Sequence, residues 1–248
     1  MRTLHATRHG ALIPLAFCLV VACKDAPASP ESATSADPAL HRDRDEDEGR
    51  GQRIAFAKLD LFLEFNSTDD DLGVQLLLDG EPWDLVRGFD PAGQEFVEFF
   101  GRGRMKELGL TELFFESAEP SPREVLALFP PGRYRFVGRG VEDQRLVGTA
   151  MLSHDLPPAP VFSPSNGEVV DKDDVVIRWR RIAGVAAYQV IVADEEQGTQ
   201  MEITLLPSAT QVTVPPELLE EDTEYKVEVI AVARNGNKTI TESDFVTK

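Results

Sequence analysis

Short runs in which apolar and polar residues alternate recur along the chain from residue 54 to residue 248. Clear examples are "VVIRW" (175–179), "AAYQVIV" (186–192) and "LEEDTEYKVEVIAVARNGN" (219–237). Successive side chains of a β-strand point to opposite faces, so a period of two buries one face of a sheet. Because the runs are short and are separated by Pro, Gly or Asn, they predict antiparallel β-sandwich structure.

The alternating region is too long for one small sandwich and fits two domains of about 100 residues each. The segment "DLPPAP" (155–160) is the natural boundary. Its prolines stiffen the linker and limit the swing between the domains that it joins. The predicted fold class is therefore all-β, with one β-sandwich at 54–155 and a second at 157–248.

The second sandwich resembles a fibronectin type III domain. That family has a tryptophan in its second strand, here Trp179, and a tyrosine-led third strand, here Tyr188. The family pattern Leu-x-Pro-x-Thr-x-Tyr-x-Val-x-Val-x-Ala reads here Leu219, Glu221, Thr223, Tyr225, Val227, Val229 and Ala231. The resemblance implies core positions for Trp179, Tyr188 and Tyr225, with Tyr225 in a tyrosine corner. Glu221 departs from the family's proline. The loop "ARNGN" (233–237) lacks Arg-Gly-Asp, so the family's integrin-binding use does not carry over.

The first sandwich, 54–155, resembles no named family. Its alternating runs include a hairpin that turns at "DPAG" (90–93). Ser121, Pro122 and Glu124 are placed as an N-cap, a first-turn proline and the partner in a capping box. This arrangement predicts a short helix between two strands.

Both sandwiches have a tyrosine six residues after a leucine. The segment "LFPPGRYRF" (128–136) places Tyr134 as "LEEDTEYKV" (219–227) places Tyr225. Each tyrosine follows a connection that we expect to be helical, so Tyr134 is predicted to form the same corner. This favours an immunoglobulin-like first domain, with a jelly roll or another sandwich as the alternative.

The first 22 residues have the pattern of a secretory signal peptide. Arg2 and Arg8 precede an apolar run, 11–22, that is shorter than the about 20 residues needed to span a membrane. Leu, Val, Val and Ala precede Cys23, which resembles a bacterial lipobox. The resemblance implies cleavage before Cys23 and lipid attachment to that cysteine. The alternatives are an ordinary signal peptide with a chance cysteine, or an uncleaved anchor.

Residues 23–53 are predicted to form the lipidated cysteine and a disordered acidic tether. They contain one leucine and no aromatic residue. Such a segment cannot bury enough apolar surface to offset the entropy of ordering it. Lys24 follows the cysteine, and Asp25 comes one place later than the aspartate that retains such lipoproteins in the inner membrane. The resemblance therefore favours the outer membrane of a bacterial cell envelope.

Composition excludes several kinds of site and partner. Cys18 and Cys23 are the two cysteines, so a chain cleaved before Cys23 has no disulfide and no cysteine zinc site. Removing residues 1–22 takes away two arginines and no acid, which lowers the formal charge from −18 to −20. Nucleic acid is disfavoured as a partner, because phosphates bind cationic surfaces.

The sequence singles out no catalytic machinery. Ser153, His154 and Asp155 are adjacent, so alternating strand geometry sends them to opposite faces and argues against a triad. No pair of acids stands out for hydrolysis. We assign no catalytic, cofactor-binding or metal residue, and we do not expect an enzyme.

The loop "NSTDDDLG" (66–73) is the most suggestive polar segment. Asp69, Asp70 and Asp71 gather oxygen ligands of the kind that calcium prefers, but the spacing of an EF-hand is absent. A solvated turn between two strands is the favoured interpretation. The basic segment "GRGRMK" (101–106) is likewise expected to be a solvated turn.

Two aromatic features are candidates for surface binding. Trp83 is a possible carbohydrate platform, although a packed strand residue is the favoured interpretation. Phe96, Phe99 and Phe100 in "EFVEFFG" (95–101) cannot all face one side of a strand. One of them is expected to be exposed in a patch of the sort that marks protein contacts.

These features predict a membrane-anchored envelope lipoprotein. Its expected role is a non-catalytic binding or spacer module for an envelope protein or polymer, acting through loops or an exposed sheet edge. The alternative is a calcium- or carbohydrate-binding accessory protein of an envelope enzyme, which a calcium-dependent rise in melting temperature would favour.

Overall fold

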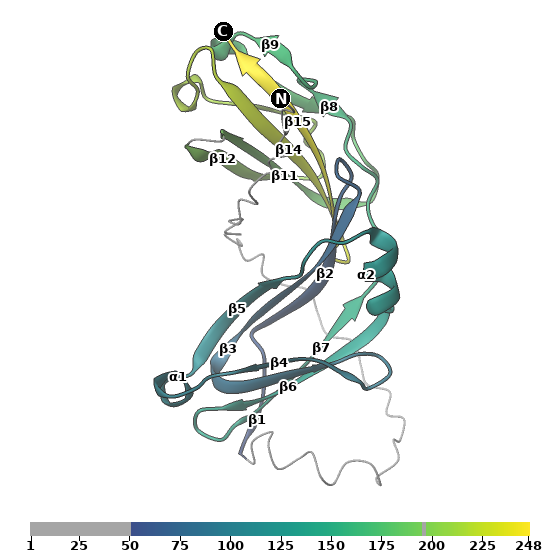
Figure 1. Ribbon diagram of the computed structural model, residues 1–248, viewed down its shortest axis with the longest axis vertical. Coiled ribbons are helices and arrows are strands. Elements are labelled where there is room, and N and C mark those ends of the chain that lie inside the picture. The colour runs from purple at the N-terminus through teal and green to yellow at the C-terminus, as the bar shows by residue number, and fades with distance from the viewer. Residues whose placement is uncertain (1–50, 195–196) are drawn as a thin grey trace, which may run out of the picture. The chain divides into compact units, whose positions relative to one another are not determined.

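The computed structural model describes residues 51–194 and 197–248 (Figure 1). The predictions for the signal peptide, for lipid attachment at Cys23 and for nearly all of the tether lie outside the described residues. Within those residues the chain is mostly β-strand, as the alternating pattern predicted. No helix among them is long and apolar enough to cross a membrane.

The N-terminal sandwich is organised by one 19-residue strand, β3 (Asp71–Phe89). Its first half pairs with β2 and β5, and its second half pairs with β4 and β6. β7 pairs with β6, and β1 pairs in parallel with β7. The other elements are β1 (Arg53–Ala55), β2 (Lys58–Asn66), β4 (Glu95–Phe100), α1 (Arg104–Leu108), β5 (Leu110–Glu116), α2 (Pro122–Leu128), β6 (Gly132–Gly140) and β7 (Arg145–Leu152).

The segment 79–82, which reads "DGEP", lies inside β3 rather than in a turn. The register of β3 against β5 shifts between Asp79 and Trp83. Such an irregularity accommodates Pro82, which cannot donate a ladder hydrogen bond, and it bends the strand. The bend allows one strand to serve both halves of the sandwich.

The core of this sandwich lies between the two halves of the bent sheet. Its fully buried side chains include Leu63, Trp83, Tyr134 and Phe136. The Tyr134 hydroxyl donates a hydrogen bond to the carbonyl oxygen of Pro130 (3.0 Å), so the predicted corner is present.

The hairpin and the helix predicted for this domain are also present. β3 turns into β4 at residues 90–93, where Gly93 has a φ of 82°. The capping box of α2 forms between Ser121 and Glu124, and Val125 packs into the core.

The C-terminal sandwich has the strand order of a fibronectin type III domain. One sheet contains β13, β10 and β8, and the other runs β12-β11-β14-β15. Trp179, Tyr188 and Tyr225 are buried, and the Tyr225 hydroxyl accepts a hydrogen bond from the backbone N–H of Glu220 (2.7 Å), which confirms the expected fold and corner. The elements are β8 (Phe162–Ser163), β9 (Glu168–Val170), η3 (Lys172–Asp174), β10 (Val176–Trp179), β11 (Val185–Asp194), β12 (Gly198–Leu205), β13 (Gln211–Thr213), η4 (Pro216–Leu218), β14 (Glu224–Ala233) and β15 (Lys238–Thr247).

Strand pairing continues from one sandwich to the other. β15 pairs in parallel with β2, which places Lys238 opposite Glu64 and Ile240 opposite Asn66. The two hydrophobic cores are nevertheless separate. Because pairing crosses between them, the boundaries at 155 and 157 stay a prediction, as does the immunoglobulin-like assignment of the first domain.

Candidate functional site

The turn between β14 and β15 makes hydrogen bonds to the N-terminal sandwich and to the linker that follows it. Asn237 is 1% exposed, and its Oδ1 accepts a hydrogen bond from the backbone N–H of Leu63 (2.9 Å). Its Nδ2 donates to the carbonyl oxygens of Ser153 (2.8 Å) and Asp155 (3.0 Å). Asn235 Nδ2 also donates to the Asp155 carbonyl oxygen (2.9 Å). The loop that displays ligand motifs in some fibronectin type III domains therefore joins the two sandwiches here.

The turn between β2 and β3 forms the other side of this junction. Ser67 donates from its hydroxyl (2.6 Å) and from its backbone N–H (2.9 Å) to the carbonyl oxygen of Ile240. Thr68 Oγ1 accepts from the backbone N–H of Glu242 (2.8 Å), and Asn66 Nδ2 donates to Glu242 Oε1 (3.0 Å). The favoured interpretation of 66–73 as a solvated turn is therefore incomplete. It is a turn, but its short polar side chains also hydrogen-bond to β15, at the carbonyl oxygen of Ile240 and at the backbone N–H and carboxylate of Glu242.

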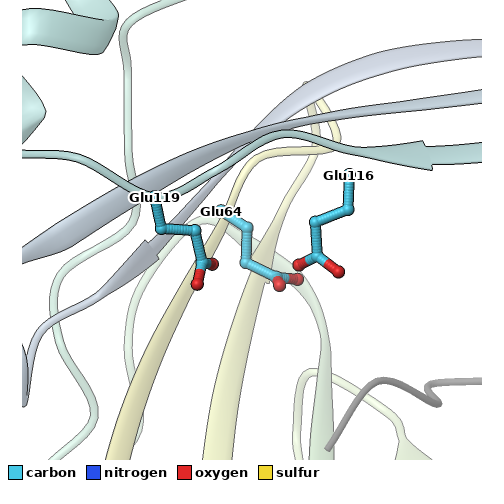
Figure 2. Close-up of side chains that lie close together, drawn as sticks. All are labelled: Glu64, Glu116 and Glu119. Carbon is cyan, nitrogen blue, oxygen red and sulfur yellow. The ribbon is translucent and has the colours of Figure 1, made fainter. Parts of the chain in front are cut away.

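Beside the junction, three glutamates from separate segments meet. Glu64 lies on β2, Glu116 on β5 and Glu119 in the connection after β5. One carboxylate oxygen of each lies within 4.8 Å of the other two. Figure 2 shows the three side chains, with the carboxylates of Glu64 and Glu116 turned toward each other.

An amide and a cation contact two of these acids, Glu64 and Glu116. Gln75 lies on β3 and is 3% exposed. Its Nε2 donates to Glu64 Oε1 (2.5 Å) and to Glu116 Oε1 (3.1 Å). Lys238 on β15 forms an ion pair with Glu64 (2.9 Å). The acids therefore belong to a charge network that spans the junction of the two sandwiches.

The connection after β5 holds Glu119 against the start of β3. Ser117 Oγ accepts a hydrogen bond from the backbone N–H of Val74 (2.9 Å), and Pro120 O accepts from the N–H of Leu72 (3.1 Å). A Cβ placed on Gly73 would lie only 3.3 Å from Glu119 Cγ. A glycine at this position thus leaves room for the glutamate to lie across the strand.

Burial and neighbouring like charges favour protonation of Glu119, Glu116 and the nearby Asp71. Burial is the largest cause that raises the pKa of Glu119 to about 7, and the charges of Asp71, Glu116, Glu64 and Glu242 add to it. Burial and neighbouring acids also raise the pKa of Asp71. Burial and Glu64 raise the pKa of Glu116, while Lys238 opposes that shift.

The raised pKa of Glu119 predicts a pH-dependent stability. The folded state holds this proton more tightly than the unfolded state, so the contribution of Glu119 falls as the pH rises from about 4.5 to about 7. Replacing it in Glu119→Gln is expected to raise the free energy of unfolding at pH 8 by about 1–2 kcal/mol, after discounting for the partial exposure of the group. At pH 4 the two chains should be equally stable.

Urea titrations at pH 4 and pH 8 measure this difference. Glu107→Gln, at an exposed acid on α1 outside the cluster, is the matched control and should show no pH-dependent difference. A Glu119→Gln chain that is no more stable than wild type at pH 8 would contradict the assignment of the raised pKa.

Carboxylate oxygens are ligands for hard cations such as calcium. Among the described residues, the group that brings its oxygens together is the three glutamates, and not Asp69, Asp70 and Asp71 of the 66–73 loop. Gln75 already joins Glu64 to Glu116, and Lys238 pairs with Glu64. We therefore describe them as a charge network and assign no metal to them.

β2, β3 and β5 together present to solvent a face of apolar and charged side chains. In register across the sheet, Asp60, Leu77 and Phe114 form one row, with side chains that point away from the core. Phe114 is 50% exposed. β2, β3 and β5 lie side by side in Figure 1. We call this side of the sheet the outer sheet face. It consists of Lys58, Asp60, Phe62, Gln75, Leu77, Asp79, Glu112, Phe114 and Glu116, and all of these except the buried Gln75 are at least partly exposed.

The aromatic residues singled out in the sequence divide into packed side chains and one exposed side chain. Trp83 is fully buried, so it is a core residue and not a platform. Phe96 packs edge-on against Phe129, Tyr134 and Phe136, with ring centroids 5.4–5.9 Å apart. Phe99 packs against Phe115, whereas Phe100 is 46% exposed. The expectation that one phenylalanine of 95–101 faces solvent is confirmed.

The remaining candidates do not form a site. His154 Nε2 bonds to the carbonyl oxygen of Phe129 (2.8 Å), while Ser153 Oγ donates to Asp155 Oδ2 (2.9 Å). The serine and the histidine therefore have different partners, and the geometry of a triad is not present. The expectation that the basic segment 101–106 is a solvated turn is correct only in part. The segment is solvated, but it includes the start of helix α1, none of whose residues is buried.

The junction and the outer sheet face could not be found from the sequence. Each combines residues far apart in the chain, such as Leu63 with Asn237 and Leu77 with Phe114. The one available signal was the polar character of the 66–73 and 233–237 turns, which does not say what the turns contact.

No family model matches the chain. Among solved structures it is similar to domains FN1–FN3 of chicken CNTN1, at 11% identity and a TM-score of 0.36, over 81% of this chain and 69% of that one. It is also similar to a two-domain fibronectin type III segment of chicken tenascin, at 14% identity and a TM-score of 0.31, over 77% of this chain and 99% of that one. An Fn3-like protein from Clostridium thermocellum matches 37% of this chain and 96% of its own, at 21% identity and a TM-score of 0.27. TM-scores this low do not establish a relationship, so the fold assignment rests on the strand order and cores described above.

Proposed function

We propose that this protein is a lipid-anchored, non-catalytic binding module of a bacterial cell envelope. The lipobox-like residues before Cys23 support the anchor, and the position of Lys24 supports the outer membrane. A fibronectin type III-like sandwich supports a binding role by analogy of fold. In this proposal the anchored chain presents its two joined sandwiches to another envelope protein.

One observation carries the choice of binding surface. The 233–237 turn is occupied by the junction, with Asn237 1% exposed, whereas Phe114 on the outer sheet face is 50% exposed. Phe114 lies in register beside the half-buried Leu77, and charged residues surround the two. An apolar patch with a polar rim is typical of a protein contact. We therefore assign recognition to the N-terminal sandwich rather than to the fibronectin-type loop.

Charge restricts the class of partner. The chain has a formal charge of −18, and four of the nine residues of the outer sheet face are acidic. Nucleic acids and anionic headgroups would be repelled by such a surface. A protein with a cationic contact region fits it.

Crosslinking in intact cells tests the proposal. The chain is crosslinked, purified in detergent and examined by mass spectrometry for attached proteins and glycans, beside a Cys23→Ser version. We expect a stoichiometric protein partner attached within 51–248, at much lower yield in Cys23→Ser, because the unanchored chain is no longer held at the membrane. Fatty-acid labelling should be present in the first chain and absent from the second.

Two results would count against this function. Equal fatty-acid labelling of both chains would contradict lipid attachment at Cys23. The absence of any attached protein from both would contradict the binding role. The calcium- or carbohydrate-binding alternative stays a prediction.

A further inference from the structure

Strand β5 is an open edge of the N-terminal sandwich. Among the described residues, β5 (Leu110–Glu116) pairs with β3 and with no other strand. Its second row of backbone N–H and C=O groups is therefore available to another strand. Open edges are the places where extended segments add to a sheet, with backbone hydrogen bonds for affinity and alternate side chains for specificity.

The side chains of this edge alternate between two environments. Leu113 and Phe115 pack against the core of the sandwich. Glu112, Phe114 and Glu116 occupy the opposite face, and Phe114 is half exposed there. An added strand would thus meet an apolar side chain with an acid on each side of it.

The neighbouring strands reinforce this pattern. In register with these three residues, β3 presents Asp79 beside Glu112 and Leu77 beside Phe114. The apolar row is therefore continuous across two strands, and it is bordered by acids.

Charge decides against a second copy of the chain as the occupant. If two β5 strands paired antiparallel around Phe114, Glu112 of each would lie opposite Glu116 of the other. Like charges directly opposite each other destabilise a strand pair, whereas opposite charges stabilise it by about 0.2–1 kcal/mol. The edge therefore disfavours self-pairing and favours a cationic strand.

We propose that β5 is the docking edge for an extended segment of a partner protein that carries lysine or arginine on both sides of an apolar residue. This inference rests on the proposed binding function and specifies its surface and its partner chemistry. The apolar residue of the partner packs beside Phe114, and its two cations lie opposite Glu112 and Glu116.

A pair of synthetic peptides tests the proposal on the full chain in mild detergent. In the first peptide, lysine, valine and lysine alternate with threonine, and in the second glutamate replaces both lysines. The lysine peptide is expected to bind with a dissociation constant at least about fivefold lower than that of the glutamate peptide. It should also slow amide hydrogen exchange within residues 110–116.

A charge reversal provides a test that misfolding cannot imitate. Glu112→Lys is expected to lower the affinity for the lysine peptide by roughly threefold or more and to raise the affinity for the glutamate peptide. The matched control is Glu202→Lys on β12, an edge strand that pairs only with β11 among the described residues. This control should leave both affinities unchanged.

Three results would overturn the assignment of β5. They are equal binding of the two peptides, slowed exchange at β12 instead of β5, and self-association of the chain that is lost in Phe114→Thr. If intact cells yield a protein partner while the lysine peptide does not bind, the binding function stands and the β5 proposal fails. If the lysine peptide binds as expected and no partner is found in cells, the edge stands and the envelope function fails.

Discussion

Replacing Asn237 with alanine is expected to lower the free energy of unfolding by about 2–4 kcal/mol, because buried hydrogen-bonding groups would lose their partners. The Asn237 side chain satisfies the N–H of Leu63 and the carbonyl oxygens of Ser153 and Asp155. Water cannot reach the Leu63 hydrogen bond without opening the junction, since Asn237 is 1% exposed.

The two tryptophans allow the effect to be located. Trp83 lies in the core of the first sandwich and Trp179 in the core of the second. In urea titrations, a Trp179→Phe background reports the first sandwich and a Trp83→Phe background reports the second. We expect coincident transitions for the parent chains and separate transitions after Asn237→Ala, because the substitution removes contacts between the sandwiches.

The control for this substitution is Asn166→Ala. Asn166 is an exposed turn residue, and its replacement should change stability by no more than about 0.5 kcal/mol. If Asn237→Ala proves as mild as this control, the junction is not an energetic link between the sandwiches.

Replacing Trp83 with alanine is expected to lower the free energy of unfolding by about 3–5 kcal/mol, the usual range for truncating a buried aromatic residue. Trp83 is 0% exposed and lies where β3 passes from one half of the sandwich to the other. The loss combines the lost burial of the indole with a cavity that the surrounding strands cannot fully close. Circular dichroism during urea unfolding measures it.

Phe114→Ala is the matched aromatic truncation on the surface. Because half of the Phe114 side chain is already exposed, its removal should lower stability by about 1 kcal/mol or less. Similar losses for the two substitutions would mean that Trp83 is not a core residue. A carbohydrate-binding role for Trp83 is inconsistent with its burial in any case.

The two predictions bear on function through the same arrangement. The junction holds together turns that would otherwise be free to bind ligands. The core around Trp83 fixes β3, which supplies the central strand of the outer sheet face. A partner that docks on β5 would therefore meet a preorganised surface, which reduces the entropy lost on binding.

The sequence by itself determined the class of fold and most of the elements. Alternation with a period of two sets which side chains of a strand can be buried, and this property is local, so "VVIRW" and "AAYQVIV" sufficed to predict strands. The spacing of Tyr134 and Tyr225 was equally informative, because a tyrosine corner bonds to backbone only four or five residues away. Alternation also predicted that one phenylalanine of 95–101 would be exposed, but it did not predict which one. Phe96 and Phe99 both reach the core because the register of β4 against β3 shifts between Glu95 and Val97.

Only the tertiary structure decided how these elements are joined and what they present. No local pattern indicates that Asn237 bonds to Leu63, 174 residues away. None indicates that Glu64, Glu116 and Glu119 converge, because strand pairing is set by the packing of whole faces. The open edge of β5 was also hidden, since an edge strand has the same alternation as a central one. It differs only in having no neighbour on one side, which the fold as a whole determines.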